Sequence, residues 1–303
     1  MTRHALAMAL ACLGLALPLL PQLDEPRLAL SAPDIVWLEG ATFVMGASER
    51  DVAYAVQICR EARPLNLDSP SPVFDGACSE MRFARELPRR RVWTAAYGMD
   101  RHEVTHGRWR ACVAAGRCAP ARVRDEDPRI AGARMPVAGV TWAEAERFCA
   151  YAGGRLPTDA EWERAARGAH PDHRFPWGRL YNDRLANHGR SPRGPDPVDG
   201  HTFAAPVGSY PDGASAYGLL DVAGNVWEWT ASPPRDDEVG MGADPSVYRL
   251  IRGGSWAQPP EALRVTHRAW QPMAAAPGDV GLRCAYDRPA LARGGRSAIL
   301  PPP

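Results

Sequence analysis

The run His102-Glu103-Val104-Thr105-His106 has the spacing of a zinc-binding motif. In HExxH motifs two histidines one helical turn apart bind the metal, and the glutamate acts as a base. That chemistry requires the whole run to be helical. Val104 and Thr105 are β-branched, and Thr105 is a favourable N-cap for a helix that starts after it. We therefore interpret the match as accidental and expect His102 to lie on the preceding strand.

Residues 1–22 have the pattern of a secretory signal peptide. Arg3 and His4 precede an apolar run from Ala5 to Leu17, which is too short for a membrane span of about 20 apolar residues. We expect an exported protein, either secreted or in the periplasm or cell envelope of a bacterium, with no transmembrane span. Cys12 follows Ala-Leu-Ala and loosely resembles a lipoprotein cleavage box, so a lipid anchor there is the alternative.

Export makes the cysteine count informative, because disulfides persist in oxidising compartments. Without Cys12, the chain has an even set of six: Cys59, Cys78, Cys112, Cys118, Cys149 and Cys284. Proximity favours pairing the first with the second and the third with the fourth, which leaves the last two for each other. Six cysteines allow about 15 connectivities, so this pairing stays open at this point.

The basic residues are all arginine. There are 36 of them and no lysine, against 35 acidic residues, for a net charge of +1. This balance argues against a nucleic-acid partner, and the absence of lysine excludes Schiff-base and Walker A chemistry. The chain also contains 30 Pro, 28 Gly and ten Trp, which argues against a helical bundle and for a loop-rich core built on aromatic side chains.

The elements that must position these residues are short. Ile35 to Met45 is rich in β-branched and aromatic residues and is broken at Glu39-Gly40, which predicts a hairpin. Residues 48–90 read as an irregular excursion that holds Cys59 and Cys78. Arg91 to Val104 is strand-like, and a short helix follows Thr105.

Two capped helices are the clearest local prediction. Thr141 with Glu144, and Thr158 with Glu161, form capping-box sequences ahead of helical runs that end at glycines. From Pro171 onward, proline and glycine recur too often for another long helix. We expect loops and short strands there.

Several segments resemble the formylglycine-generating enzyme family, also called sulfatase-modifying factors. They occur in the family's order: LEGATFVMG (38–46), HEVTHGRWRACV (102–113), MPVAGVTWAEAERFCAYAGGRLPTDAEWERAARG (135–168), FPWG (175–178), APVGSYP (205–211), YGLLDVAGNVWEW (217–229), RGGSW (252–256) and GLRC (281–284). The resemblance implies one compact α+β domain of low regular secondary structure, related to the C-type lectin fold, and a Cys149–Cys284 disulfide. We divide the chain into a signal peptide (1–22), a linker (23–33), this domain (34–288) and a disordered tail (289–303).

The resemblance also implies two calcium sites. Calcium takes six to eight hard oxygen ligands, often from both carboxylates and backbone carbonyls. By position in the motifs, the first set is Asn187 and Asp199 with the carbonyls of His188 and His201. The second set is Asp221 and Glu228 with the carbonyls of Gly224 and Val226, where Asp221 replaces the asparagine usual in the family.

The family's oxidase chemistry uses a cysteine pair just after RGGS, which binds copper(I) through soft thiolates. Here the stretch from Ser255 to Arg264 has no cysteine, and none occurs from 150 to 283. Gln258 and Leu263 are poor replacements. We therefore predict that copper is not bound and that the cysteine-dependent oxidation is absent, with no catalytic residue assigned.

The family's substrate cleft falls at five positions of this chain: Arg252, Ser255, Trp256, Arg264 and Arg268. An Arg/Trp lining suits a peptide or an anionic small molecule. The alternative is that Trp256 belongs to the core and the arginines pair with nearby acids.

We expect an exported, calcium-stabilised, monomeric protein that binds a peptide or protein partner in this cleft without being an oxidase of the cysteine-copper type. The alternative is an oxidoreductase of the same family that acts through residues other than cysteine, by protein cysteine oxidation or a divergent metal-dependent oxidation. The family's sulfoxide synthases use an additional iron-binding helical domain, for which this chain lacks the histidine pattern.

Overall fold

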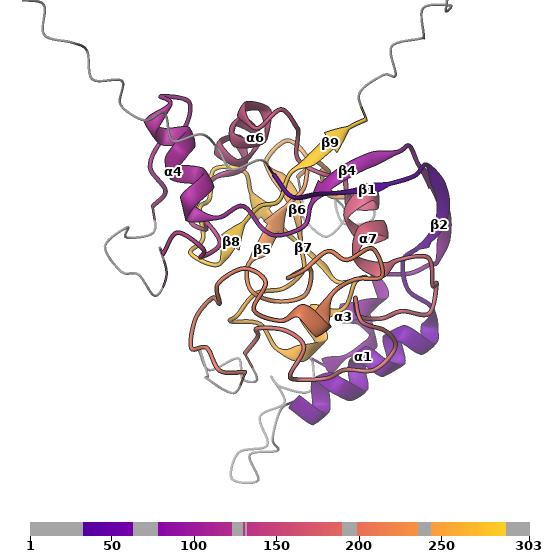
Figure 1. The fold of residues 1–303 in the computed structure, drawn as a ribbon. Coiled ribbons are helices and arrows are strands. Elements are labelled where there is room, and N and C mark those ends of the chain that lie inside the picture. Colours follow the sequence, from indigo (N-terminus) through magenta and orange to yellow (C-terminus); the bar gives the residue numbers. More distant parts are fainter. Residues whose placement is uncertain are drawn as a thin grey trace, which may run out of the picture.

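The computed structural model describes residues 33–62, 78–122, 130, 132–189, 199–235 and 244–288 (Figure 1). The predicted signal peptide with Cys12, the predicted linker up to residue 32 and the predicted tail 289–303 lie outside these residues. No helix in the described ranges is long and apolar enough to cross a membrane.

Both ends of the domain meet in one antiparallel sheet. Its strands are β1 (Ile35–Leu38), β4 (Tyr97–Asp100) and β9 (Ala285–Asp287), with β4 in the centre. Ile35 pairs with Asp100, and Tyr97 pairs with Asp287. This sheet closes the fold, because its first and last strands are separated by most of the chain.

The predicted hairpin between residues 35 and 45 is wrong. β2 (Ala41–Met45) pairs with β3 (Arg90–Thr94), whereas β1 pairs with β4, so the two neighbouring strands enter different sheets. The break at Glu39-Gly40 redirects the chain without reversing it. A Cβ at Gly40 would lie 3.2 Å from the Trp93 ring, so the ring packs closely on the bend.

The central sheet has the strand order β7-β6-β5-β8. Its members are β5 (Trp227–Trp229), β6 (Tyr248–Arg252), β7 (Arg268–Pro272) and β8 (Val280–Gly281). β5 pairs antiparallel with β6 and parallel with the short β8. The predicted short strands of the C-terminal half are therefore confirmed, and they place Glu228 and Arg252 opposite each other.

The three helices that were predicted from capping signals are present. They are α4 (His106–Ala114), α6 (Trp142–Tyr151) and α7 (Asp159–Arg167). Thr105 caps α4 by accepting a hydrogen bond from the Arg108 amide, and both α6 and α7 begin with complete capping boxes. These helix starts are fixed locally because the cap satisfies amides that have no partner within the helix.

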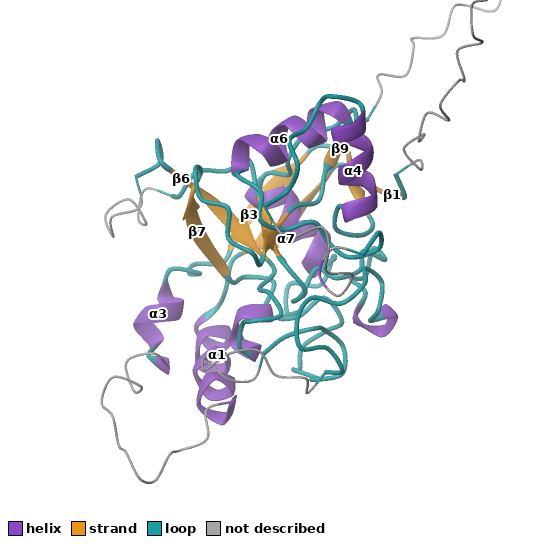
Figure 2. Ribbon diagram, turned by 90° about the vertical axis from the view of Figure 1, so that its left-hand side faces the viewer, coloured by secondary structure: helices purple, strands orange, loops and turns teal. Residues whose placement is uncertain are grey.

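The prediction of an irregular excursion at 48–90 is wrong in part. The segment contains α1 (Glu49–Ala62) and α3 (Glu80–Ala84). Val52, Ala55, Val56 and Cys59 follow the i, i+3, i+4, i+7 spacing of an apolar helix face and are buried. Figures 1 and 2 place these two helices at the end of the molecule opposite α4 and α6.

Aromatic packing dominates the core, as the tryptophan count predicts. The Trp109 and Phe148 rings stack with centroids 5.2 Å apart, and Trp229 lies in the same buried cluster. Two short 3₁₀ turns, η2 (Pro211–Gly213) and η3 (Pro260–Leu263), order the loops. α1 packs directly on η3, with Ile58 and Leu263 in one buried cluster.

Candidate metal and cleft sites

The HExxH run does not form a zinc helix. α4 begins at His106, so His102 and Glu103 precede the helix and the two imidazoles do not share one helical face. Glu103 is instead a buried structural carboxylate. It accepts hydrogen bonds from Asn225 Nδ2 at 2.6 Å and from the Val226 amide at 3.0 Å. The run therefore contributes a residue to a different site, beside Asp221 and Glu228.

The first predicted calcium set is brought together by the Asp199 carboxylate. The Asp199 carboxylate accepts hydrogen bonds from the amides of His188, at 2.5 Å, and His201, at 3.0 Å. Asn187 is buried and donates to the Phe203 carbonyl at 3.1 Å. Its other side-chain atom, Oδ1, is buried without a hydrogen-bond partner in the described part of the chain, so an acceptor oxygen is left over here.

The second set is centred on a buried ion pair. Arg283 donates two parallel hydrogen bonds to Glu228, from Nε to Oε2 at 2.8 Å and from Nη2 to Oε1 at 2.7 Å. Trp162 Nε1 donates to the same Oε2 at 2.6 Å. Asp221 lies in the left-handed region at φ 56° and accepts from the Gly208 amide at 2.7 Å.

Three carboxylates crowd this second set. Burial raises the pKa of Asp221 to about 6. Burial, followed by the charges of Asp221 and Glu228, raises the pKa of Glu103 well above its usual range. Arg283 is the cation that faces all three. The raised pKa values of Glu103 and Asp221 mean that their ionised forms are disfavoured here, and a bound cation would favour ionisation.

The two sets are joined at the backbone. The Asn225 amide donates to the Asn187 carbonyl at 2.9 Å. A Cβ at Gly224 would lie 1.9 Å from that same carbonyl oxygen, so only glycine permits the approach. The Asn187 main chain therefore lies in direct contact with the segment that carries the second set.

These residues fit calcium better than a transition metal. In the described ranges, no group of three or more His, Cys, Asp or Glu side chains could hold a metal ion. Calcium, unlike zinc, takes many ligands from backbone carbonyls and amide oxygens. The unpaired Asn187 oxygen and the carboxyl groups gathered beside Asp221 match that preference.

The predicted cleft arginines are interior residues. Arg252, Arg264 and Arg268 are each at most 1% exposed. Arg252 binds Asp159 at 2.5 Å and Glu163 at 2.9 Å. Arg252 and Arg264 therefore follow the alternative prediction, in which the arginines pair with acids, and the partner of Arg264 is Glu86. Arg268 donates a hydrogen bond to the Arg85 carbonyl. The sequence does not reveal this, because the partner acids are distant along the chain.

The other two cleft residues differ from each other. Ser255 is fully buried, and its hydroxyl donates to Asp279 at 2.8 Å. Trp256 is half-buried, and its ring packs edge-on against Phe203 with centroids 5.2 Å apart. Of the five predicted positions, only Trp256 presents part of its side chain to solvent.

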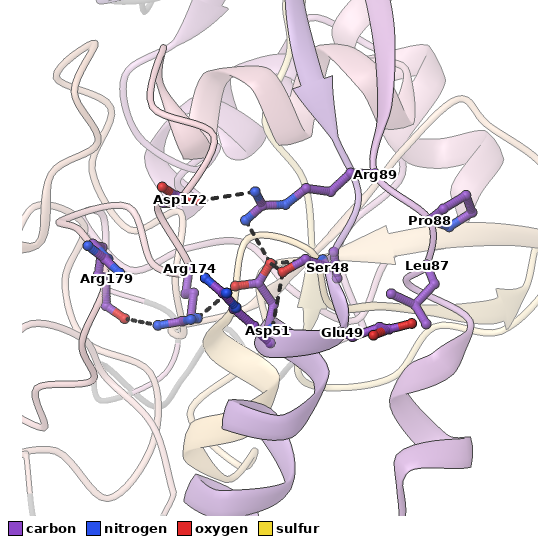
Figure 3. A pocket seen from close by; sticks show the side chains of 11 residues that line it. Ser48, Glu49, Asp51, Leu87, Pro88, Arg89, Asp172, Arg174 and Arg179 are labelled. Carbon is purple, nitrogen blue, oxygen red and sulfur yellow. Dashed lines mark hydrogen bonds and ion pairs between the residues drawn. The ribbon is translucent and has the colours of Figure 1, made fainter.

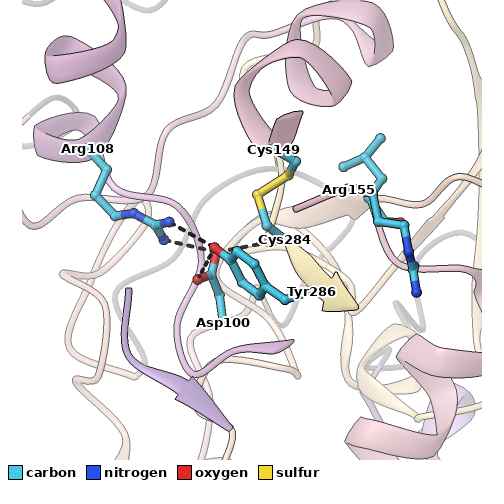
Figure 4. The surroundings of a disulfide bond; sticks show 7 residues. Asp100, Arg108, Cys149, Arg155, Cys284 and Tyr286 are labelled. Atoms are coloured by element: carbon cyan, nitrogen blue, oxygen red, sulfur yellow. Dashed lines mark hydrogen bonds and ion pairs between the residues drawn. A yellow bond between two sulfur atoms is a disulfide. The ribbon is translucent and has the colours of Figure 1, made fainter. Parts of the chain in front are cut away.

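All six predicted cysteines form disulfides, and all three predicted pairings are confirmed. The bonds are Cys59–Cys78, Cys112–Cys118 and Cys149–Cys284. Figure 4 shows the last bond beside a polar cluster in which Asp100 binds Tyr286 Oη at 3.0 Å and Arg108 at 2.9 Å. No free thiol therefore remains in the described part of the chain.

One concave feature was missed from the sequence. A cavity lies between the start of α1, the segment entering β3 and the loop that follows α7 (Figure 3). Arg50 and Arg89 lie in the 48–90 segment that the sequence predicts to be irregular, and Arg174 and Arg179 flank the FPWG motif without belonging to it. The only sequence signal was the high arginine density of these segments.

These observations define a single α+β domain with little regular secondary structure, held by three disulfides and a tryptophan-rich core. The chain belongs to the sulfatase-modifying factor family, because residues 22–288 match the family described as "Sulfatase-modifying factor enzyme 1-like domain". The resemblance inferred from the ordered motifs is thus confirmed at the level of the family.

The chain is similar to proteins with different activities. It is 41% identical over 169 residues to a hercynine oxygenase of Mycolicibacterium smegmatis, a match that covers 50% of this chain and 37% of that protein. It is 38% identical over 158 residues to the inactive C-alpha-formylglycine-generating enzyme 2 of Bos taurus, covering 50% of each. The matches thus span between about a third and a half of these relatives.

Among solved structures, PvdO from Pseudomonas aeruginosa superimposes with a TM-score of 0.60 at 26% identity, covering 84% of this chain and 94% of that one. The fold therefore extends over nearly the whole domain, and the relatives do not agree on one reaction.

Proposed function

We propose that this protein is an exported member of the family that binds a peptide or protein partner, is stabilised by calcium, and does not perform the cysteine-copper oxidation. The absence of cysteine-copper oxidation is supported by the state of the cysteine thiols. Every cysteine from Cys59 to Cys284 is in a disulfide, and no cysteine occurs between Cys149 and Cys284. Copper(I) oxidation of a substrate cysteine needs soft thiolate ligands, and this domain offers none.

Calcium stabilisation is supported by charge and by unused acceptors. Glu103, Asp221 and Glu228 lie in the interior around the Arg283 guanidinium, and Asn187 Oδ1 lacks a donor among the described residues. A divalent cation would stabilise the ionised forms of these carboxyl groups and use oxygens of the kind that calcium prefers. Asn187 and Asp199, with the carbonyls of His188 and His201, would hold one ion, and Asp221 and Glu228, with the carbonyls of Gly224 and Val226, would hold a second.

Partner binding is supported by the surface around Trp256. Its ring and that of Phe203 form a half-exposed aromatic pair next to the Asp199 loop. Aromatic side chains are enriched in binding surfaces because they bury a large area at little cost in conformational entropy. The similarity to an inactive C-alpha-formylglycine-generating enzyme 2 agrees with a function other than the cysteine-copper oxidation.

The alternative is an oxidoreductase that uses residues other than cysteine. The similarity to a hercynine oxygenase favours it, because that relative is an oxygenase by name. Protein cysteine oxidation and a divergent metal-dependent oxidation are the two forms of this alternative.

The deciding experiment for catalysis is incubation of the purified protein with a peptide carrying the sulfatase motif, in air, with copper(I) and separately with iron(II). We expect the peptide mass to stay unchanged. Conversion of the cysteine to formylglycine, detected as a loss of mass, would contradict the proposal and support the oxidoreductase.

Cross-linking in the native host tests the proposal that a partner binds at the Trp256 surface. A photoreactive residue in place of Phe203 should capture one protein or peptide, and Trp256→Ala should abolish capture. Trp93, which is 65% exposed on β3, provides the control, because Trp93→Ala leaves the Trp256 surface intact. Equal loss of capture in both variants would argue against this surface.

A further inference from the structure

The cavity beside α1 has about the size of a small-molecule site. Its volume is about 570 Å³, within the range of about 300–1,000 Å³ typical of ligand pockets. None of its residues belongs to the calcium sets or to the predicted cleft. The lining consists of Ala47, Ser48, Glu49, Arg50, Asp51, Leu87, Pro88, Arg89, Asp172, Arg174 and Arg179.

Asp51 organises the cavity from beneath. It is 3% exposed, and both of its oxygens accept hydrogen bonds. Oδ2 accepts from the Ser48 amide and hydroxyl and from Arg89 Nη2 at 2.8 Å, while Oδ1 accepts from Arg174 Nε at 2.8 Å. Both oxygens of the Asp51 carboxylate therefore have protein donors. The carboxylate orients the guanidiniums of Arg89 and Arg174 at the cavity (Figure 3).

The two oriented guanidiniums are held rigidly. Arg174 stacks on the Tyr54 ring at 4.6 Å from its centroid, and Arg89 also binds Asp172 through Nη1 at 3.0 Å. Burial by itself would lower the pKa of Arg89, but Asp172 and Asp51 raise it, so the group stays charged. A planar guanidinium fixed by a carboxylate retains N–H donors that match the oxygens of an anion.

The balance of charge in the cavity is positive. The lining holds four arginines and three acids, which gives 4 − 3 = +1. Arg50 and Arg179 form no ion pair with any described residue. Asp172 is 61% exposed, so its pairing with Arg89 is a surface salt bridge of small energetic value that a ligand can displace.

We propose that this cavity binds a small multivalent oxyanion, a molecule bearing phosphate or several carboxylates. Arg89 and Arg174 supply fixed donors, Arg179 and Arg50 supply mobile positive charge at the rim, and Asp172 competes with the ligand for Arg89. A cation is disfavoured because the lining carries a net positive charge. The proposal does not depend on the calcium sites or on the Trp256 surface.

The test is titration calorimetry at low ionic strength, with pyrophosphate and citrate as the two probes and sodium chloride as the reference salt. We expect saturable binding of one of them, and the preferred probe distinguishes phosphate from carboxylate chemistry. Arg179→Gln and Arg50→Gln should each weaken binding by about fivefold or more, as expected for the loss of a charge-assisted contact. Both side chains are exposed, so these variants should fold normally.

Two further variants separate a built site from general attraction of anions. Asp172→Asn should tighten binding, because it removes the competitor for Arg89 while keeping the side-chain size. Arg147→Gln, at an exposed position on α6, lowers the net charge by the same amount as Arg179→Gln or Arg50→Gln and should leave affinity unchanged. Absence of binding by both probes, equal weakening by Arg147→Gln, or no gain from Asp172→Asn would each overturn the proposal.

Discussion

Glu86 and Arg264 form a forked ion pair in the interior, although they lie 178 positions apart in the sequence. Arg264 Nη1 and Nη2 donate to the two Glu86 oxygens at 2.6 and 2.8 Å, and both side chains are at most 1% exposed. Thr266 adds a hydrogen bond to Glu86 at 2.6 Å. The pair joins the segment after α3 to the segment after η3, so the α1–α3 excursion is part of the folded core.

Glu86→Gln should strongly destabilise the fold. It leaves the Arg264 guanidinium buried without a countercharge, which costs about 3–5 kcal/mol in comparable proteins. Urea unfolding measures the loss. Glu39→Gln is the control, because Glu39 pairs with Arg288 at the surface and should cost at most about 1 kcal/mol.

If Glu86→Gln does not fold, the double variant Glu86→Gln/Arg264→Met keeps the prediction testable. Removing both charges should recover stability relative to the single change, because neither charge is then buried alone. A double variant that is no more stable than Glu86→Gln would contradict this explanation.

Acid should destabilise the protein through His267. Burial is the largest cause that lowers the pKa of His267, from 6.5 to about 4, and the Glu86 carboxylate only partly opposes it. The unfolded chain therefore binds a proton at a pH at which the folded protein does not. The resulting stability is complete above pH 6.5 and falls as the pH drops toward 4.

Between pH 7 and pH 5 we expect this residue to account for a loss of about 2 kcal/mol in the free energy of unfolding. The pH dependence of the free energy of unfolding, measured by urea titration in the wild type and in His267→Gln, isolates this contribution, because the raised pKa of Asp221 acts in the opposite direction in both proteins. His267→Gln should lose the contribution. His170→Gln, at an exposed histidine, should retain it. Identical pH dependence in the wild type and His267→Gln would refute the assignment.

The three disulfides should contribute unequally. Cys149–Cys284 closes a loop of 135 residues, whereas Cys112–Cys118 spans 6. Loop-closure entropy predicts a stabilisation of about 5 kcal/mol for the first and about 2 kcal/mol for the second. Paired Cys→Ala variants, compared by urea unfolding under oxidising conditions, should therefore rank in that order. Equal losses would show that packing, rather than chain entropy, determines the effect.

Calcium should raise the melting temperature of protein that has been treated with a chelator and dialysed. At a concentration of 100 times the dissociation constant the gain is about 2.7 kcal/mol, which corresponds to roughly 5–10 °C for a domain of this size. Differential scanning fluorimetry with calcium, and with magnesium as the reference ion, measures it.

Asp199→Asn should reduce this response, because it removes a carboxylate charge from the first predicted set. Asp212→Asn, at an exposed position in η2, is the matched control and should respond like the wild type. An unchanged melting temperature on adding chelator and then calcium would count against both sites.

Much of the local structure could be predicted from the sequence. Thr105, Thr141 and Thr158 marked the starts of α4, α6 and α7, because a cap and its helix are only a few residues apart. The partners of β1 and β2 could not be predicted, since the turn at Glu39-Gly40 is compatible with either a hairpin or a change of sheet. α1 was missed although its apolar spacing was present, because nearby prolines and cysteines suggested an irregular segment.

The candidate site was predicted unevenly. The motifs grouped Asn187 with Asp199 and Asp221 with Glu228, but they gave no sign that Glu103 or Arg283 would join the second group. The same motifs placed Arg252 and Arg264 in an open cleft, whereas both are interior residues with acidic partners. A motif gives only the position of a residue in the chain. The exposure of that residue depends on the segments that pack over it in the folded structure.

The sequence by itself determined the family, the cysteine set and the absence of thiolates after Ser255, because these depend only on residue types and their order. The tertiary structure decided which charges are buried, which arginines face solvent, and where a cavity lies. Those properties depend on contacts between residues far apart in the chain, such as Glu86 with Arg264 and Asp51 with Arg174. Burial then sets their energies, because a charge taken out of water is stable only beside its partner.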